Sequence, residues 1–265
     1  MALTFPNIDP VAFSLGPIDL RWYALSYMAG FLLGLYFIKR FVEKYPSQYL
    51  TKGMFDDLLT WVIIGVILGG RLGYVFFYNL PFYVDNPIDA LKVWQGGMAF
   101  HGGLIGVITA MILFAWKHKM PFFALADRVA VVTPIGLFFG RIANFINGEL
   151  YGRVTDAPWG MVFVDGDVAR HPSQIYQALT EGLVLFAVLV IAQRSKYIRA
   201  HYGIISGLFL CVYALQRFFV EFTRQPDEQI GLLMGGISMG QLLCLPMFAA
   251  GLIIIWYSNR KYATA

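Results

Sequence analysis

The chain has 265 residues, of which 58% are hydrophobic and only 14% are charged, and its formal net charge is +4. Soluble globular domains carry about 25% charged residues, so this composition excludes an ordinary water-soluble fold. The basic residues gather in short clusters between apolar runs, which is typical of loops that flank membrane spans and argues against a nucleic-acid surface.

Seven apolar segments approach the length of about 20 residues that a membrane-spanning helix needs. They lie near residues 20–38, 55–78, 97–115, 129–146, 173–193, 203–222 and 236–257. The pattern predicts an all-α polytopic membrane protein with seven transmembrane helices, built as a single integral-membrane domain over residues 1–265. The longest polar stretch predicts a small extramembrane element at about 148–172, with short strands around Trp159–Val164.

The distribution of lysine and arginine predicts the orientation of the chain. Twelve of these residues follow the first, third, fifth and seventh segments, whereas five lie on the opposite side. Because cytoplasmic loops carry the excess of positive charge, we expect the N-terminus outside and the C-terminus in the cytoplasm. The element at 148–172 then lies on the outer, periplasmic side.

Glycines recur at four-residue intervals in most of the predicted spans. Such pairs let helix backbones approach closely in lipid. A phosphate-binding glycine loop is disfavoured because the chain has no GxxxxGK[ST] motif, and no longer internal repeat supports an inverted-repeat transporter. The intervals are Gly30/Gly34, Gly65/Gly69/Gly73, Gly102/Gly106, Gly136/Gly140, Gly203/Gly207 and Gly236/Gly240.

Five charged residues fall within or at the ends of the apolar segments: Arg71, Arg141, Glu181, Arg217 and Glu221. An unpaired charge at the centre of a span costs roughly 2.5–3.5 kcal/mol on insertion scales. These side chains must therefore face the bundle interior, pair with one another, lie near the interface or meet a ligand.

Helical spacing groups these charges with other polar residues into three stripes. Three predicted helices could thus converge on one wet cavity. The stripes are Arg141 with Asn144, then Gln174 with Gln177 and Glu181, and finally Tyr213 with Arg217, Glu221 and Arg224.

Two interpretations of the buried charges remain open. Salt bridges such as Arg217 with Glu221 could merely hold the bundle together. The three arginines nevertheless exceed the two glutamates, and we expect Arg224 and Glu149 to cancel each other near the outer ends. An uncompensated guanidinium suits phosphate oxygens, and a phospholipid headgroup is the anion most available in a bilayer. This points to lipid chemistry or to lipid or anion transport.

The remaining polar residues narrow the chemistry. Asn147 and Gly148 are expected to end the fourth predicted helix, with Arg141 about two turns inside it. The four histidines are scattered, so no metal site is expected. His101, at the outer start of the third span, is the histidine best placed for proton transfer, apart from His171 in the outer loop. The two cysteines do not indicate a disulfide framework.

Seven stretches of the sequence, taken together, resemble the prolipoprotein diacylglyceryl transferases over nearly the whole chain. The stretches are RWYAL (Arg21–Leu25), LGGRLGYVFFYN (Leu68–Asn79), WQGGMAFHGGLIG (Trp94–Gly106), GRIANFINGELYGR (Gly140–Arg153), RHPSQIYQ (Arg170–Gln177), RFFVEFTRQPD (Arg217–Asp227) and ISMGQ (Ile237–Gln241). The resemblance implies transfer of the sn-1,2-diacylglyceryl group from phosphatidylglycerol to the lipobox cysteine of a preprolipoprotein signal peptide. It also implies a multi-pass location in the bacterial cytoplasmic (inner) membrane, with the lipid bilayer as a partner and the active site toward the periplasm.

This activity assigns roles to particular residues. Arg141 and Arg217 would stabilise charge on the phosphate, with Asn144 as a neutral donor, and His101 would take the proton of the substrate thiol. Glu149 and Glu221 would orient the arginines, Tyr23 and Tyr213 would donate to the headgroup or peptide, and the remaining expected substrate-binding residues are Asn147, Gly152 and Arg224. No cofactor or metal is implied. The alternative is a phospholipid or anion transporter with an arginine-lined cavity.

Overall fold

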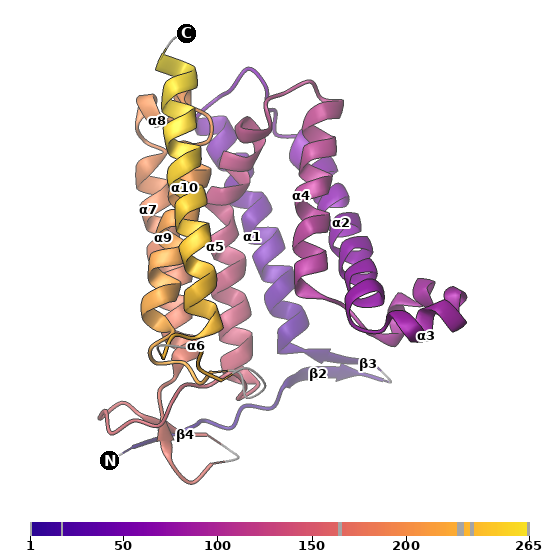
Figure 1. Cartoon of the computed structure of the whole chain (residues 1–265), viewed down its shortest axis with the longest axis vertical. Coiled ribbons are helices and arrows are strands. Elements are labelled where there is room, and N and C mark those ends of the chain that lie inside the picture. The colour runs from indigo at the N-terminus through magenta and orange to yellow at the C-terminus, as the bar shows by residue number, and fades with distance from the viewer. Residues whose placement is uncertain (1, 17, 164–165, 227–230, 234–235, 264–265) are drawn as a thin grey trace. The chain divides into compact units, whose positions relative to one another are not determined.

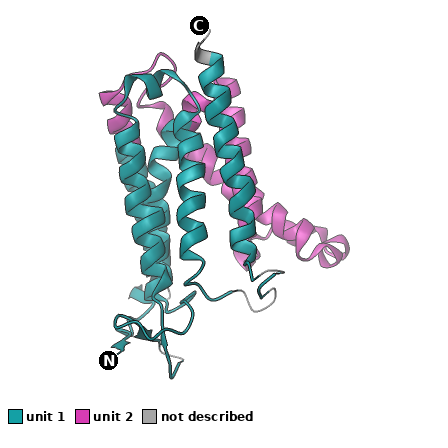
Figure 2. Cartoon of the chain, turned by 60° about the vertical axis from the view of Figure 1, so that its left-hand side comes forward, with its two compact units in different colours: residues 1–37, 127–265 teal, residues 38–126 magenta. Residues whose placement is uncertain are grey.

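Helices dominate the structure, a computed structural model that describes residues 2–16, 18–163, 166–226, 231–233 and 236–263 (Figure 1). The chain forms two compact units, drawn in different colours in Figure 2. Residues 1–37 and 127–265 make the first unit, and residues 38–126, which interrupt it in sequence, make the second unit.

Six helices of the described chain are long and apolar enough to cross a membrane. They are α1 (Trp22–Lys44), α2 (Met54–Phe77), α4 (Phe100–Lys117), α5 (Phe122–Ile146), the helix Ser173–Ala192, and Met239–Lys261 within α10 (Met239–Ala263). The prediction of an all-α polytopic membrane protein is confirmed. The seventh predicted span, at 203–222, corresponds to the shorter apolar helix α9 (Ile204–Val220) and remains a prediction as a span.

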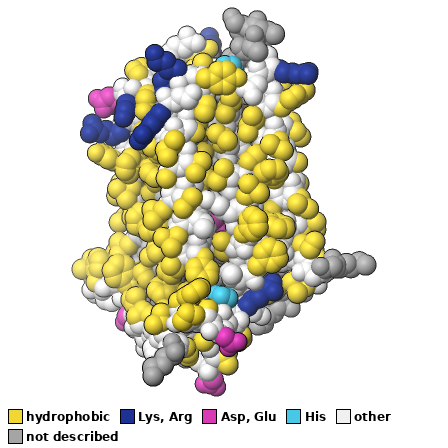
Figure 3. All heavy atoms as spheres, turned by 90° about the vertical axis from the view of Figure 1, so that its left-hand side faces the viewer, with side chains coloured by type: hydrophobic (Ala, Val, Ile, Leu, Met, Phe, Trp, Pro, Cys, Tyr) yellow, Lys and Arg dark blue, Asp and Glu magenta, His cyan; other side chains and the backbone are white. Residues whose placement is uncertain are grey.

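Large apolar side chains are exposed along the spans. Leu32 of α1, Ile64 of α2 and Ile253 of α10 are 60%, 51% and 63% exposed. On the face drawn in Figure 3, hydrophobic side chains cover the middle and charged side chains gather toward the two ends. An apolar surface of this extent would be unstable in water but suits hydrocarbon.

The second unit is built on close contact between α2 and α4. A Cβ on Gly73 would lie 2.8 Å from the Cα of Gly102, and one on Gly69 would lie 2.8 Å from the Cα of Gly106. The two backbones therefore touch, and the packing interpretation of these glycines is confirmed. Three short helices connect α2 to α4: α3 (Leu80–Asp85), η1 (Pro87–Leu91) and η2 (Val93–Gln95).

Glycines also allow close packing in the first unit. A Cβ on Gly207 of α9 would lie 2.7 Å from the carbonyl oxygen of Gly251 in α10, and one on Gly30 of α1 would lie 3.1 Å from the Cα of Gly136 in α5. A Cβ on Gly140 would meet no described atom within 4 Å. The interval Gly136/Gly140 is thus a packing contact at its first residue and not at its second.

A buried carboxylate fixes α9 against α5. Asp127 of α5 accepts hydrogen bonds from the backbone N–H groups of Gly203 and Ser206, at 2.8 and 2.9 Å, and from the Ser206 hydroxyl at 2.6 Å. The first N–H groups of a helix have no partner within the helix, so this side chain from another helix satisfies them. The helix α8 (Lys196–Ala200) precedes this junction.

Short strands accompany the helices of the first unit. The strands β1 (Leu3–Thr4), β4 (Met161–Val162) and β5 (Ala169–Arg170) form a sheet in the order β1–β4–β5, and β2 (Val11–Leu15) pairs with β3 (Ile18–Arg21) in an antiparallel hairpin. The predicted strands around Trp159–Val164 are therefore confirmed at β4, although residues 164 and 165 lie outside the described residues. The parallel pairing of β4 with the N-terminal strand was not predicted.

Candidate active site

A row of alternating arginines and glutamates links three helices of the first unit. Arg141 of α5 lies 3.7 Å from Glu181, and Glu181 lies 3.6 Å from Arg217 of α9. Arg217 also lies 3.0 Å from Glu221, and Glu221 lies 3.8 Å from Arg224. We call these five residues the arginine–glutamate row. The predicted polar stripes of three helices do converge.

Burial and charge make this row unusual for a membrane-spanning bundle. The side chains of Glu181 and Glu221 are 0% and 4% exposed, whereas those of Arg141, Arg217 and Arg224 are 21%, 12% and 16% exposed. Three cations face two anions, so the row carries one positive charge in excess. The carboxylates of the row do not balance its guanidiniums, so the remaining charge must be compensated by groups outside the row.

Several of these ion pairs are too long to be hydrogen bonds. The contacts of Glu181 exceed the usual N–H···O range of 2.7–3.2 Å, and neither of its carboxylate oxygens has a hydrogen-bond donor among the described residues. The Nη1 atom of Arg217 likewise has no acceptor in the described part of the chain. Because a buried donor without an acceptor costs free energy, this guanidinium is set to receive an anionic oxygen.

Glu181 is the site residue that the sequence-based assignment omitted. It lies in a π-helical segment, η3 (Ala178–Val184), between α6 (Ser173–Gln177) and α7 (Leu185–Ala192). Single π turns inside α-helices occur often at functional sites. The stripe of Gln174, Gln177 and Glu181 was the signal that could have identified it.

Glu221 is held in place by the start of α10. A Cβ on Gly240 would lie 2.8 Å from the carboxyl carbon of Glu221, so only glycine leaves room for this acid. Ser238 and Gln241 form a capping box there, because each side chain bonds the backbone N–H of the other, at 3.2 and 3.0 Å. The side chain of Gln241 also donates to the carbonyl of Phe218 on α9, at 3.4 Å.

A second polar group surrounds the end of α5. Asn144 donates to the Glu149 carboxylate at 2.7 Å, and Asn147 donates to the same oxygen at 3.3 Å. Gln174 donates to the backbone carbonyl of Glu149 at 2.6 Å. The helix ends at Ile146 and Gly148 has a φ of +67°, which agrees with the helix end predicted at Asn147 and Gly148.

These contacts change one of the expected pairings. We expected Glu149 and Arg224 to cancel each other, but in the structure Arg224 pairs with Glu221 at 3.8 Å and Glu149 accepts from two asparagine amides. Glu221 does contact an arginine on either side, as expected. Helical spacing along one chain segment could not distinguish an amide partner from a guanidinium partner for Glu149.

The other expected substrate-binding residues differ in their surroundings. The Tyr23 hydroxyl lies 3.3 Å from that of Tyr27 at the start of α1, and Tyr213 lies one turn before Arg217 on α9 with its ring stacked on Phe209. Gly152 donates its N–H to the carbonyl of His171 at 2.8 Å. A Cβ on Gly152 would lie 2.7 Å from that same oxygen, so tight packing accounts for this glycine.

His101, the expected proton acceptor, belongs to the second unit. It stands in the first turn of α4, exposed, with its ring edge-on to Phe100 at 5.5 Å between centroids. An exposed imidazole at a helix start is accessible for proton transfer, which is the property that its expected role needs.

Arg71, the third arginine within the spans, is also in the second unit and is paired differently. It is 4% exposed and donates to the carbonyls of Ala90 and Asp89, at 2.9 and 2.6 Å, and to that of Gly96. Its guanidinium also lies 5.2 Å from the ring centre of Tyr83. Its N–H groups thus donate to the segment that connects α2 to α4, which gives Arg71 a structural role.

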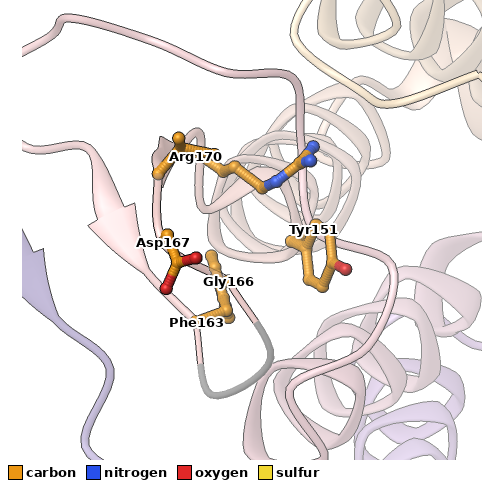
Figure 4. Close-up of a pocket in the computed structure, with 6 residues that line it drawn as sticks. Tyr151, Phe163, Gly166, Asp167 and Arg170 are labelled. Carbon is orange, nitrogen blue, oxygen red and sulfur yellow. The ribbon is translucent and has the colours of Figure 1, made fainter.

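The segment 148–172 contains a cavity of about 280 Å³ (Figure 4). The guanidinium of Arg170 lies 5.0 Å from the ring centre of Tyr151 and donates to the carbonyl of Gly152 at 3.2 Å. These contacts hold the Arg170 side chain against the loop. The cavity is lined by Tyr151, Phe163, Gly166, Asp167, Val168 and Arg170.

His171 is anchored beside this cavity. Its Nδ1 lies 3.1 Å from the hydroxyl of Tyr176, and that hydroxyl accepts from the indole of Trp159 at 2.7 Å. Burial lowers the pKa of His171 below its ordinary value, so the neutral imidazole is favoured. These bonds fix the ring as part of the loop. Among the described residues, no three His, Cys, Asp or Glu side chains gather as metal ligands would.

Fold and site together define a multi-pass membrane protein with a buried cluster of arginines and glutamates. Comparison with known proteins makes this specific. The sequence profile of the prolipoprotein diacylglyceryl transferase family matches residues 10–257, and the chain belongs to this family.

Individual relatives agree over almost their full lengths. The chain is 52% identical to the phosphatidylglycerol–prolipoprotein diacylglyceryl transferase of Azospirillum brasilense, over 99% of each chain. It is 50% identical to the protein of the same name from Rickettsia felis, over 98% of this chain and 100% of the relative. The corresponding protein of Gluconobacter oxydans is also 50% identical, over 98% of this chain and 96% of its own length.

Proposed function

We propose that this protein transfers the sn-1,2-diacylglyceryl group from phosphatidylglycerol to the thiol of a lipobox cysteine in a preprolipoprotein signal peptide. Its relatives carry the name of this activity. The observation that carries the proposal is the arginine–glutamate row, in which Arg141 and Arg217 both lie near the buried Glu181 beyond hydrogen-bond length and the Nη1 of Arg217 lacks an acceptor among the described residues. A lipid phosphate would supply the missing anion.

The reaction replaces a carbon–oxygen bond by a carbon–sulfur bond. The thiolate attacks the glyceryl carbon that bears the phosphate ester, a thioether forms, and the bond between that carbon and the ester oxygen breaks. The electron pair of that bond goes to the phosphate oxygen, and glycerol phosphate leaves. The nucleophile belongs to the peptide substrate, so the enzyme needs no nucleophile of its own.

The arginines have the main catalytic role in this scheme. Negative charge grows on the leaving phosphate, and fixed guanidinium donors stabilise it most where charge develops. Arg141 and Arg217 would hold the phosphate from two helices. Asn144, held by its bond to Glu149 at 2.7 Å, would add a neutral donor.

Deprotonation of the substrate thiol completes the reaction. A thiol with an ordinary pKa of about 8.5 is mostly protonated at neutral pH and needs a base or a positive environment. His101 would accept this proton. Tyr23, Asn147, Gly152, Tyr213, Glu221 and Arg224 complete the proposed substrate-binding set.

The proposed topology follows the distribution of positive charge. Seven spans, with α9 as the sixth, place the N-terminus outside and the C-terminus in the cytoplasm of the bacterial inner membrane, in one integral-membrane domain. The twelve-to-five excess of lysine and arginine on one side supports this orientation. The segment 148–172 and the active site would then face the periplasm.

The test combines the purified protein, phosphatidylglycerol and a labelled peptide that contains Leu-Ala-Gly-Cys. We expect a lipid-modified peptide, loss of the product with Arg141→Ala, and no product when the acceptor cysteine is replaced by serine. No product with the unaltered protein, or an undiminished product with Arg141→Ala, would refute the assignment. Lipid movement in liposomes without a thioether product would instead support the alternative of a transporter.

A further inference from the structure

The two arginines proposed to bind the lipid phosphate share one carboxylate. Glu181 lies between Arg141 and Arg217, at 3.7 and 3.6 Å, and is fully buried. A carboxylate and a phosphate compete for the same guanidinium groups, since both are anions recognised by the same fork of N–H donors. Glu181 therefore has a direct influence on how tightly phosphate binds.

The distances show how this carboxylate differs from an ordinary salt-bridge partner. At 3.6–3.7 Å it supplies negative charge, because Coulomb attraction acts beyond hydrogen-bond length. It does not occupy the N–H donors, since neither of its oxygens has a hydrogen-bond donor among the described residues. Glu221 lies closer to Arg217, at 3.0 Å, although the Oε2 atom at that distance also has no hydrogen-bond donor among the described residues. Glu181 thus lowers the positive charge of the site while the donors stay open.

The surrounding segment fixes the backbone that carries Glu181. The residue lies within the π-helical segment η3. Its neighbour Gly182 packs directly on α5, where a Cβ would lie 2.7 Å from the Cβ of Phe138. Thr180 donates to the carbonyl of Tyr176 at 2.7 Å. These contacts fix the register of the segment and direct the Glu181 side chain between the two guanidiniums, at 3.7 and 3.6 Å.

We propose that Glu181 is a positioning residue that spaces Arg141 and Arg217 and weakens their affinity for phosphate, so that the released glycerol phosphate can leave. This inference rests on the proposed function. Without Glu181 the row would carry a larger positive excess, and the product would dissociate slowly. Catalysis gains from interactions that are stronger in the transition state than in the product or substrate complex.

The experiment measures phosphate binding separately from turnover. The probes are inorganic phosphate and glycerol phosphate, added to the full-length protein in detergent, with the dissociation constants read by calorimetry. Glu181→Gln keeps the shape of the side chain and removes its charge. We expect it to bind both probes more tightly, by about tenfold, while kcat falls by about tenfold because product release slows and the arginines repel each other.

Two further variants separate charge from packing. Glu181→Asp keeps the charge and shortens the side chain, so phosphate affinity should stay within about twofold of the unaltered protein while kcat falls. Leu183→Ala changes a side chain of the same segment that is 49% exposed and should leave both quantities unchanged. If Glu181→Gln does not fold, the proposal is tested with Glu181→Asp alone. An unaltered kcat in Glu181→Asp would then refute the proposal.

The possible outcomes distinguish this inference from the proposed function. Weaker or unchanged phosphate binding in Glu181→Gln overturns the inference, because a merely structural acid would weaken binding and turnover together. Absence of thioether product with the unaltered protein defeats the proposed function, whatever the phosphate affinities are. Tighter binding together with slower turnover supports both.

Discussion

The two units of this protein each bury an arginine within an apolar helix, and they do so in different ways. In the second unit, Arg71 donates to backbone carbonyls and lies against an aromatic ring. In the first unit, Arg217 faces two carboxylates and keeps one donor atom without an acceptor among the described residues. An arginine thus holds chain segments together in one unit and forms a candidate ligand site in the other.

The difference lies in which groups accept hydrogen bonds from the guanidinium. Backbone carbonyls satisfy a guanidinium permanently because they cannot leave, and such an arginine has little capacity left for a ligand. Carboxylates at long distance compensate charge and leave N–H groups available. Burial alone therefore does not identify a functional arginine, whereas the hydrogen-bond partners do.

The largest effect that would test this contrast is expected in Arg141→Lys. A lysine keeps the charge but cannot reproduce a planar fork of donors, so we expect kcat to fall by roughly a hundredfold or more, as for the loss of an oxyanion donor. Steady-state transfer to a lipobox peptide measures this. A mild effect would show that only charge matters at this position, and the contrast with a structural arginine would disappear.

Arg71→Gln tests the other side of the comparison. Loss of the guanidinium leaves buried carbonyls without donors, each at a cost of about 1–3 kcal/mol, so the midpoint of thermal unfolding in detergent should drop. Transfer activity per folded molecule should change far less than in Arg141→Lys. Arg40→Gln, at an exposed position of α1, is the control and should change neither quantity.

A matched pair of glycine substitutions, one in each unit, tests the helix contacts assigned to these glycines. Gly106→Ala places a methyl group against the backbone of α2 and should destabilise the protein by about 1–3 kcal/mol. Gly140→Ala meets no described atom within 4 Å and should stabilise α5 by roughly 0.5–1 kcal/mol through helix propensity. Equal effects in chemical denaturation would contradict the assigned contacts.

The smallest expected effect concerns His171, which is bonded in the loop of the first unit. Its folded-state pKa is lowered by burial, so its contribution to stability is present above its unfolded pKa of about 6.5 and is lost as the pH falls through the lower folded-state value. Thermal midpoints at pH 7.5 and pH 5 should therefore differ slightly less in His171→Gln than in the unaltered protein. A larger difference between the two thermal midpoints in the variant than in the unaltered protein would contradict the lowered pKa of His171.

Much of the fold was accessible from the sequence because hydrocarbon imposes a simple requirement on chain segments. Long apolar runs located the helices, and helical spacing placed Tyr213 and Arg217 on one face of α9, whereas Glu221 caps that helix and Arg224 lies beyond its end. The longest polar stretch also suggested short strands around Trp159–Val164, where β4 lies. Local patterns of this kind depend only on neighbouring residues.

Other features depend on contacts between distant segments and could not be predicted. Leu3 pairs with Met161 across the sheet, and nothing in either sequence specifies its partner. The carbonyl partners of Arg71 lie 18 to 26 residues further along the chain. The π turn at Glu181 changes the helical register locally, so spacing alone indicated a polar face but not the bridge between two arginines.

The direct backbone contact between α2 and α4 also limits the paths open to lipids. Carbonyl and Cα atoms of Gly65, Gly69 and Gly73 approach those of Gly102 and Gly106 so closely that not even a methyl group fits. An acyl chain is wider than a methyl group, so it could pass only if the two helices separated. Separation would expose their backbones to hydrocarbon. This seam is closed to diacylglycerol tails, so substrate and lipidated product must enter and leave the bundle elsewhere.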